Sequence, residues 1–126
     1  MKFTSYASRI HGETAYIFGG KALDFDLGGG LEETMQTFIN TGVCRIVLTM
    51  RGMKFLHSTL FAGLLAIQKQ LEELGGDLIL AEVPWFVQMM LEEMGLLHRF
   101  AIVPNELTVT RAENIKIDLN NVILPG

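Results

Sequence analysis

The chain has 126 residues and a formal net charge of −4, with 49% hydrophobic and 19% charged residues. This length is typical of a single domain, and the hydrophobic share is enough for one buried core. A nucleic-acid-binding domain normally carries a basic face, so the acidic balance and the lack of any run of Lys and Arg argue against that class of function.

The N-terminal residues and the single cysteine indicate a cytoplasmic protein. The first residues lack the apolar core of a signal peptide, and no apolar stretch reaches the roughly 18 residues of a membrane span. Cys44 lies in an apolar run and has no second cysteine to pair with, so we expect a buried structural thiol rather than a nucleophile. We therefore expect one soluble, cytoplasmic domain over residues 1–126.

The N-terminal third predicts a hairpin followed by a loop and a helix. Residues 3–10 and 14–18 are expected to be strands joined by a short turn. Residues 28–30 are three glycines, which indicate a loop or a turn with unusual backbone angles. Residues 31–41 carry apolar side chains at the spacing of one helix face, which predicts the first helix.

The middle of the chain alternates between strands and helices. Residues 43–50 form a nearly continuous apolar, β-branched run, which is typical of a strand covered on both faces. Ser58 is expected to cap the next helix. Residues 77–81 predict another short buried strand, and Pro84 is placed to open a helix over residues 85–94.

The C-terminal segment leaves two alternatives open. Residues 100–103 are expected to form the last strand. Asn105 is a good cap for a following helix, but residues 107–110 and 115–119 alternate polar and apolar side chains as strands do. The structure of residues 104–126 therefore stays open. The order of elements predicts an α/β fold, with a mainly parallel mixed sheet, an N-terminal antiparallel hairpin and helices packed against it.

Groups that could carry catalysis or bind a cofactor are few. The three histidines lack the spacing of a metal site, and the glycines at 28–30 lack the flanking residues of a phosphate-binding loop. Asp24 and Asp26 form either an acid pair or, as is commoner in such loops, two solvated carboxylates. His57 precedes Ser58, but catalysis by such a pair also needs an orienting carboxylate and an oxyanion pocket. We expect no catalytic residue, no metal and no cofactor.

A tryptophan and several methionines gather in the helix expected over residues 85–94. Methionine at helical spacing is usually core filler. The side chains predicted to face the core are Phe86, Val87, Met90, Leu91 and Met94. For Trp85, burial and exposure in a docking patch are about equally favoured, because tryptophan is enriched at protein interfaces.

The segment of residues 46–61 resembles the signature of the STAS domain (sulphate transporter and anti-sigma factor antagonist). In that family a buried strand and a short turn precede Phe-Ile-Asp-Ser-Ser-Gly-Leu at the start of a helix. Here the segment reads Ile-Val-Leu-Thr-Met-Arg-Gly-Met-Lys-Phe-Leu-His-Ser-Thr-Leu-Phe. Three further family motifs match in order, at residues 20–24, 75–80 and 87–96. The resemblance covers about residues 3–112 and implies the STAS fold.

The resemblance also implies a function and a site. In anti-sigma factor antagonists of this family, a partner kinase that is also an anti-sigma factor phosphorylates the serine of the motif, and the unphosphorylated domain binds that partner. Carried over, the phosphoacceptor position falls on Ser58, with Thr59 beside it. We expect the partner to dock around the start of this helix and on the neighbouring loop, at Asp24, Phe25, His57, Ser58, Thr59 and Leu60.

The motif departs from the family pattern at His57, where the family has Asp, at Leu60, where it has Gly, and at Thr49, where an Asp often ends the strand. Two hypotheses for a protein-binding module follow. One is a partner-switching regulator controlled by phosphorylation at Ser58, with an anti-sigma factor kinase or a signalling complex as its partner. The other is an unphosphorylated adaptor or subunit of a larger signalling or transport complex. A small-molecule sensor or enzyme that uses Asp24, His57 and the glycine loop is a remote third hypothesis.

Overall fold

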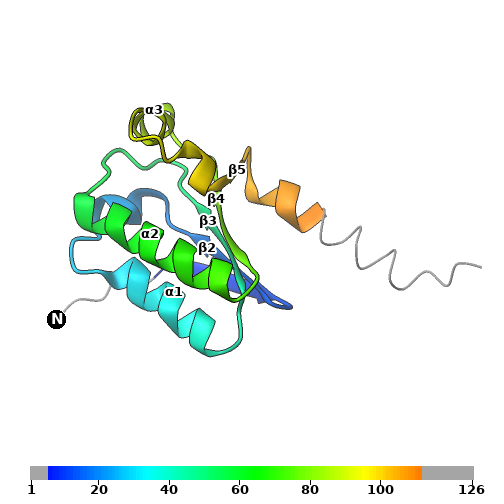
Figure 1. The fold of residues 1–126 in the computed structure, drawn as a ribbon. Coiled ribbons are helices and arrows are strands. Elements are labelled where there is room, and N and C mark those ends of the chain that lie inside the picture. The colour runs from blue at the N-terminus through cyan, green and yellow to red at the C-terminus, as the bar shows by residue number, and fades with distance from the viewer. Residues whose placement is uncertain (1–5, 112–126) are drawn as a thin grey trace, which may run out of the picture.

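The computed structural model describes residues 6–111, and within them the strands form one five-stranded sheet (Figure 1). The strands are β1 (Ala7–His11), β2 (Thr14–Phe18), β3 (Arg45–Thr49), β4 (Asp77–Ala81) and β5 (Ala101–Val103). Their order in space follows their order in the chain. β1 pairs antiparallel with β2, and all other neighbours run parallel. The predicted mainly parallel sheet with an N-terminal hairpin is thereby confirmed.

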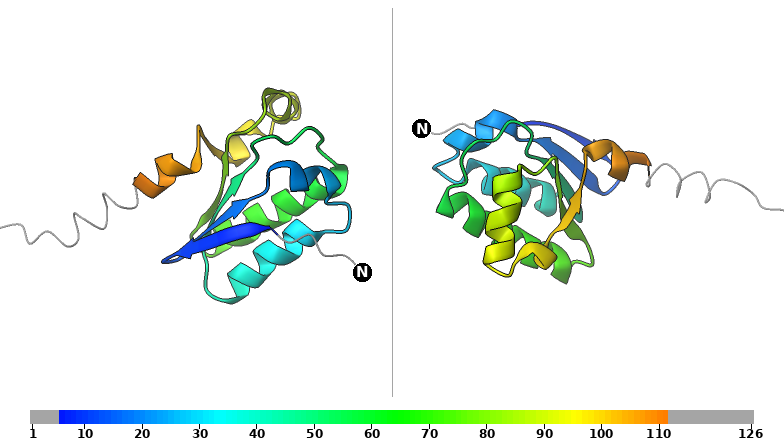
Figure 2. Two further views of the ribbon diagram at one scale, coloured as in Figure 1. Left: turned by 180° about the vertical axis from the view of Figure 1, so that it is seen from behind. Right: turned by 90° about the horizontal axis from the view of Figure 1, so that it is seen from above.

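Helices connect the strands. They are η1 (Gly20–Phe25), α1 (Gly30–Asn40), α2 (Ser58–Glu73), α3 (Trp85–Glu93) and η2 (Leu97–Arg99), where η marks a 3-10 helix. α1 and α2 lie side by side across one face of the sheet, whereas η1 and α3 lie near the end where the parallel strands finish (Figures 1 and 2). Within residues 6–111, no helix combines the length and the hydropathy that crossing a bilayer requires.

The glycine loop before α1 adopts the unusual backbone angles that the sequence indicates. Gly29 stands at the N-cap of α1 with φ of 81° and ψ of 20°, in the left-handed region. A residue with a Cβ atom is strained there, so glycine lets the chain enter α1 directly from the loop.

The tail continues as a helix after β5. Residues 106–111 are helical, and the side-chain oxygen of Asn105 accepts a hydrogen bond from Thr108 N at 3.2 Å. For this part of the tail, the helical alternative capped by Asn105 is confirmed. The strand predictions for residues 3–5 and 115–119 lie outside the described residues.

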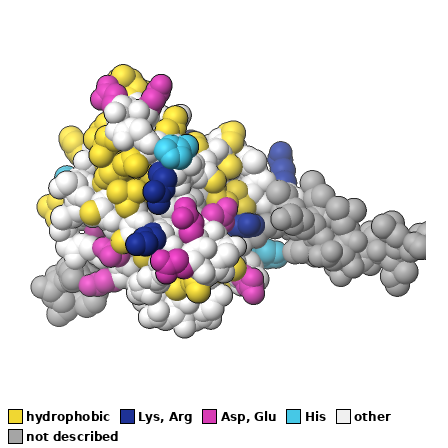
Figure 3. All heavy atoms as spheres, in the orientation of Figure 1, with side chains coloured by type: hydrophobic (Ala, Val, Ile, Leu, Met, Phe, Trp, Pro, Cys, Tyr) yellow, Lys and Arg dark blue, Asp and Glu magenta, His cyan; other side chains and the backbone are white. Residues whose placement is uncertain are grey.

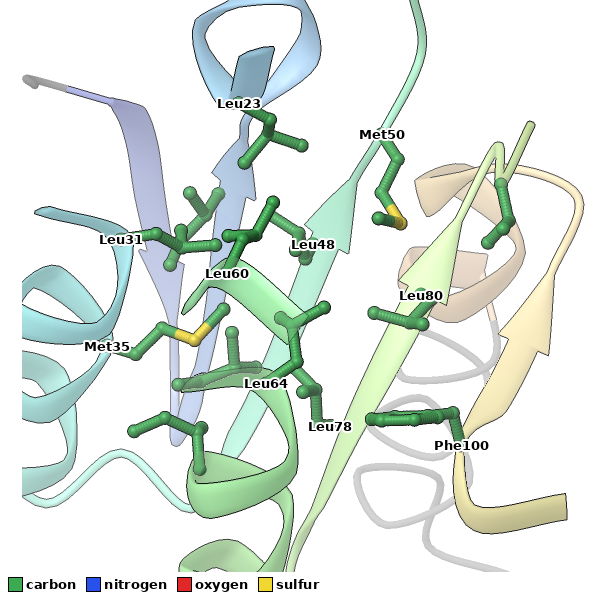
Figure 4. Packing of buried hydrophobic residues seen from close by; sticks show 14 of the residues in the cluster. Leu23, Leu31, Met35, Leu48, Met50, Leu60, Leu64, Leu78, Leu80 and Phe100 are labelled. Atoms are coloured by element: carbon green, nitrogen blue, oxygen red, sulfur yellow. The ribbon is translucent and has the colours of Figure 1, made fainter. Parts of the chain in front are cut away.

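The main core lies between the sheet and the helices (Figure 4). Alternate strand residues face it because successive side chains of a strand point to opposite faces. They are Ala15, Ile17, Ile46, Leu48, Leu78 and Leu80. The opposite face carries a smaller buried cluster of Tyr16, Val47, Ile79 and Ala81, together with Val109 from the helix at 106–111. Both faces of β3 and β4 are thus covered, as their continuous apolar runs predict.

α3 contacts the core along a narrow strip. Val87 and Leu91 are buried, and Phe86 packs against the core in part, as predicted. The prediction that Met90 and Met94 face the core is wrong, because their side chains are 39% and 52% exposed. Periodicity marks the apolar side of this helix, but only the strip of Val87 and Leu91 is buried in the core.

Candidate docking site at the start of helix α2

Asp24 joins η1 to the loop that precedes α2. Its Oδ1 atom accepts hydrogen bonds from the backbone N–H groups of Lys54, at 2.8 Å, and Phe55, at 2.9 Å. Hydrogen bonds to a carboxylate are stronger than those between neutral groups. The carboxylate therefore holds the loop of residues 50–57 against η1.

His57 adds a third bond between the same two segments. Its Nε2 atom lies 2.6 Å from the carbonyl oxygen of Asp24. A carbonyl oxygen can only accept, so Nε2 carries the proton and donates it. His57 also occupies the N-cap position of α2, with an extended backbone and no side-chain capping bond. The prediction that Ser58 caps α2 is therefore wrong: Ser58 is the first helical residue.

Asp26 follows Asp24 by two residues but serves a different element. Asp26 is buried, and its oxygens accept hydrogen bonds from Gly30 N at 3.0 Å, from Leu31 N at 2.7 Å and from the Tyr6 hydroxyl. The carboxylate thus sits at the N-terminus of α1, where the helix dipole favours negative charge. Burial, and then the neighbouring carboxylate, raise the pKa of Tyr6 above its ordinary value of 10.0. Asp24 and Asp26 form neither an acid pair nor two solvated carboxylates.

Ser58 and Thr59 are exposed in the first turn of α2. Within residues 6–111, neither hydroxyl has a hydrogen-bond partner. The backbone bond from Phe61 N to His57 O, at 3.0 Å, is the first of the helix. The N–H groups of residues 58–60 therefore have no partner inside the helix, which leaves an N-terminus that favours an anion. Both hydroxyls are open to modification.

Leu60 belongs to the interior. Its side chain is 5% exposed and packs in the main core, where Figure 4 shows it close to Leu31 and Leu48. Its bulk anchors the first turn of α2 onto the sheet. Because the side chain is not available to a partner, we leave Leu60 out of the docking surface proposed below.

Three large apolar side chains are exposed on the segments that Asp24 joins. Phe25 ends η1, Leu27 follows it, and Phe55 precedes α2; their side chains are 77%, 66% and 60% exposed. We call Phe25, Leu27 and Phe55 the loop patch. Sequence reasoning named Phe25 but missed the other two, since apolar residues in loops have no periodicity. Leu27 and Phe55 could have been found as apolar residues next to turns, where a buried position is not expected.

Small-molecule chemistry has little support at this site. A cavity between α1 and α2, which Thr59 helps to line, has a volume of about 10 Å³, room for about one water molecule. The Asp24 carboxylate and the His57 ring are both bonded to the chain's own backbone. Among residues 6–111, no three His, Cys, Asp or Glu side chains are grouped to hold a metal ion.

The family model of the STAS domain matches residues 9–112, most of the chain. The chain belongs to the STAS domain family. The resemblance carried by residues 46–61 is thereby confirmed. No curated protein sequence matches the chain significantly.

Several solved structures share the STAS fold with this domain. The unphosphorylated form of the anti-sigma factor antagonist SpoIIAA superposes with a TM-score of 0.72 and 20% identity, covering 87% of this chain and 97% of that chain. The phosphorylated form of Bacillus SpoIIAA gives a TM-score of 0.69 and 18% identity, with 86% and 99% covered. A putative anti-sigma factor antagonist from Thermotoga maritima gives 0.67 and 13% identity, with 85% and 92% covered. The family model and these structures agree on the STAS fold.

Proposed function

We propose that this STAS domain is a protein-binding regulator of a cytoplasmic partner-switching pathway, without catalytic activity of its own. Its partner, an anti-sigma factor with serine kinase activity or a signalling complex that contains one, docks at the start of α2. The observation that carries the proposal is the exposure of Ser58 and Thr59 beside a loop that Asp24 and His57 hold in place.

The loop patch supplies apolar area for docking. Phe25, Leu27 and Phe55 each expose most of their side chain, and aromatic residues are enriched at protein interfaces. The bonds from Asp24 and His57 fix the loop before the partner arrives. A loop that is already ordered loses less conformational entropy on binding, which favours tighter association.

Phosphorylation of Ser58 would oppose that docking. A phosphate adds a charge of about −1.5 to −2 at neutral pH. The N-terminus of α2 tolerates this charge, so the fold is kept. Docking an apolar partner surface onto the loop patch would, however, remove water from the phosphate, and desolvating an unpaired charge is costly. The phosphate therefore acts on the complex and not on the domain.

His57 favours a second candidate function. The ring stands where the STAS motif has Asp, and its hydrogen bond to the Asp24 carbonyl ties it to η1. A kinase that recognises a carboxylate beside the serine finds none at this position. The second candidate is therefore an adaptor or subunit of a signalling or transport complex that binds its partner constantly, without phosphorylation.

The two candidates are separated by intact mass and phosphosite mapping of the protein isolated, with its partners, from its native cell. A phosphate on Ser58 or Thr59 in part of the population supports the switch. An unmodified protein that stays in its complex under all growth conditions supports the adaptor.

Affinity measurements on the isolated complex give an independent test. We expect Ser58→Asp to weaken partner binding at least tenfold and Ser58→Ala to leave it unchanged. Asn40→Asp is the control, since Asn40 is exposed at the end of α1 and the variant adds the same charge outside the candidate site. Equal affinity of all variants would exclude the switch. If no stable partner is found at micromolar concentration, the docking role itself fails.

A further inference from the structure

α3 presents an apolar face to solvent, which decides the open question about Trp85. The side chains of Trp85, Met89, Met90 and Met94 are 72%, 48%, 39% and 52% exposed. Trp85 and Met89 are four residues apart, as are Met90 and Met94, so each pair lies along one line of the helix. We call these four residues the α3 face.

The α3 face ends in negative charge. Glu92 and Glu93 are exposed in the last turn of α3, which itself contains no Lys, Arg or His; the next cationic side chains along the chain, His98 and Arg99, are exposed in η2. Within residues 6–111, neither glutamate has an ion-pair partner. The helix dipole disfavours negative charge at a C-terminus, so this placement costs the isolated helix some stability. Figure 3 shows acidic and hydrophobic side chains together over α3, at the top of the molecule.

This pattern of charge selects among possible occupants. Pairing of α3 with the α3 of a second copy would bring four carboxylates together, and only His98 and Arg99 of η2, outside the helix, could offset them. An anionic membrane surface would be repelled by Glu92 and Glu93. A partner segment with an apolar stripe and neighbouring cations satisfies both parts of the surface, because its cations pair with the glutamates.

We propose that the α3 face docks a basic amphipathic helix of a partner protein. The apolar stripe of that helix covers Trp85 and the methionines, and its Lys or Arg side chains pair with Glu92 and Glu93. Methionine side chains adapt to the shape of a bound helix, and tryptophan is a common energetic anchor of interfaces. The proposal rests on α3 alone and does not depend on Ser58.

Trp85 provides the readout, since it is the only tryptophan in the chain. The probes are two synthetic helical peptides of about 18 residues that lack tryptophan. Both carry the same leucine stripe; one has lysine on its polar face and the other glutamate. We expect the leucine–lysine peptide to shift Trp85 emission to shorter wavelength and to protect it from acrylamide quenching. We expect no change with the leucine–glutamate peptide.

Two double variants test the role of charge. Glu92→Gln with Glu93→Gln should weaken binding of the leucine–lysine peptide roughly three- to tenfold, as expected for two exposed ion pairs. The control is Glu72→Gln with Glu73→Gln, which removes the same charge from the last turn of α2 and should leave binding unchanged. All four residues are exposed, so the variants should fold.

Four results would overturn the proposal. They are equal binding of both peptides, equal weakening by both double variants, an emission shift that depends only on the concentration of the domain itself, and an emission shift caused by vesicles of anionic lipid. The third result would assign the α3 face to a second copy, and the fourth would assign it to a membrane. None of them would affect the docking role proposed for Ser58 and the loop patch.

Discussion

Replacing Asp24 by alanine tests whether this carboxylate organises the candidate docking site. The substitution removes the acceptor for two backbone N–H groups, those of Lys54 and Phe55. A hydrogen bond to a charged group contributes about 1.5–3 kcal/mol to stability. Both bonds lie at the surface, where water replaces the lost acceptor, so the lower end of this range applies. We expect Asp24→Ala to lower the free energy of unfolding by about 2–3 kcal/mol, a large share of the ~5–15 kcal/mol typical of a domain.

Asp24→Asn separates the charge from the geometry. The asparagine side-chain oxygen can still accept from both N–H groups, but as a neutral acceptor worth about 0.5–1.5 kcal/mol per bond. We therefore expect a loss of roughly 1 kcal/mol, clearly smaller than that of Asp24→Ala. Urea unfolding followed by circular dichroism measures both losses. Hydrogen exchange shows whether the loss arises in this loop, since the amides of Lys54 and Phe55 should lose protection in Asp24→Ala.

The refuting result is specific. If Asp24→Ala costs less than about 0.5 kcal/mol, within the range of an ordinary surface substitution, and the amides of Lys54 and Phe55 exchange as in the native protein, Asp24 does not hold the loop. The loop patch would then not be presented by a loop that is ordered before the partner binds.

Two further predictions concern the interior. The pKa of Tyr6 is raised in the folded state by burial and by Asp26, so the contribution of Tyr6 to stability is complete below its ordinary pKa of 10.0 and decreases as the pH rises beyond it. The decrease is at most about 1.4 kcal/mol per pH unit. In urea unfolding at a series of alkaline pH values, Tyr6→Phe should therefore lose less stability with rising pH than the native protein. An equally steep fall in this variant would show that Tyr6 is not the group that titrates. At Gly76, an added Cβ atom would lie 1.6 Å from the carbonyl oxygen of Cys44, whereas at Gly75 it would meet nothing within 4 Å. We expect Gly76→Ala to lower the free energy of unfolding by about 3 kcal/mol or more. Gly75→Ala should lower it by about 1 kcal/mol, because φ is +80° at Gly75. Equal losses in urea unfolding would show that the backbone near Cys44 shifts to make room for the added Cβ atom.

The replacements around the family serine have distinct physical consequences. Leu60, in the place of Gly, adds a buried side chain under the first turn of α2. His57, in the place of Asp, exchanges a negative charge for a ring that is bonded to η1. Both side chains attach the turn to the rest of the domain. Neither blocks access to the hydroxyls of Ser58 and Thr59, which are exposed.

The order of strands and helices was predictable because it depends on local pattern. β3 and β4 are continuous apolar runs, and residues 31–41 and 85–94 carry apolar side chains at helical spacing. The family motif at residues 46–61 then identified the likeness to STAS domains, which the family model confirms. The parallel arrangement of most strands followed from the alternation of strands and helices.

The docking site was predictable only as a set of neighbouring positions. Sequence reasoning brought Asp24 and His57 together through the family motif. It could not show that one residue bonds the other's backbone, because that contact joins segments 33 residues apart. Leu60 and Phe55 illustrate the same limit: both are apolar residues near the start of α2, but one is buried and the other is exposed.

By itself, the sequence determined the α/β class, the strand and helix order and the position of the serine at the start of α2, because these depend on short-range periodicity and on a contiguous motif. Only the tertiary structure decided which apolar side chains the sheet could cover. α3 shows this most clearly: Val87 and Leu91 reach the core, while Trp85 and Met89, on the same apolar helix, remain in solvent. Burial depends on what packs against a surface, and a sequence pattern marks the surface without showing its neighbour.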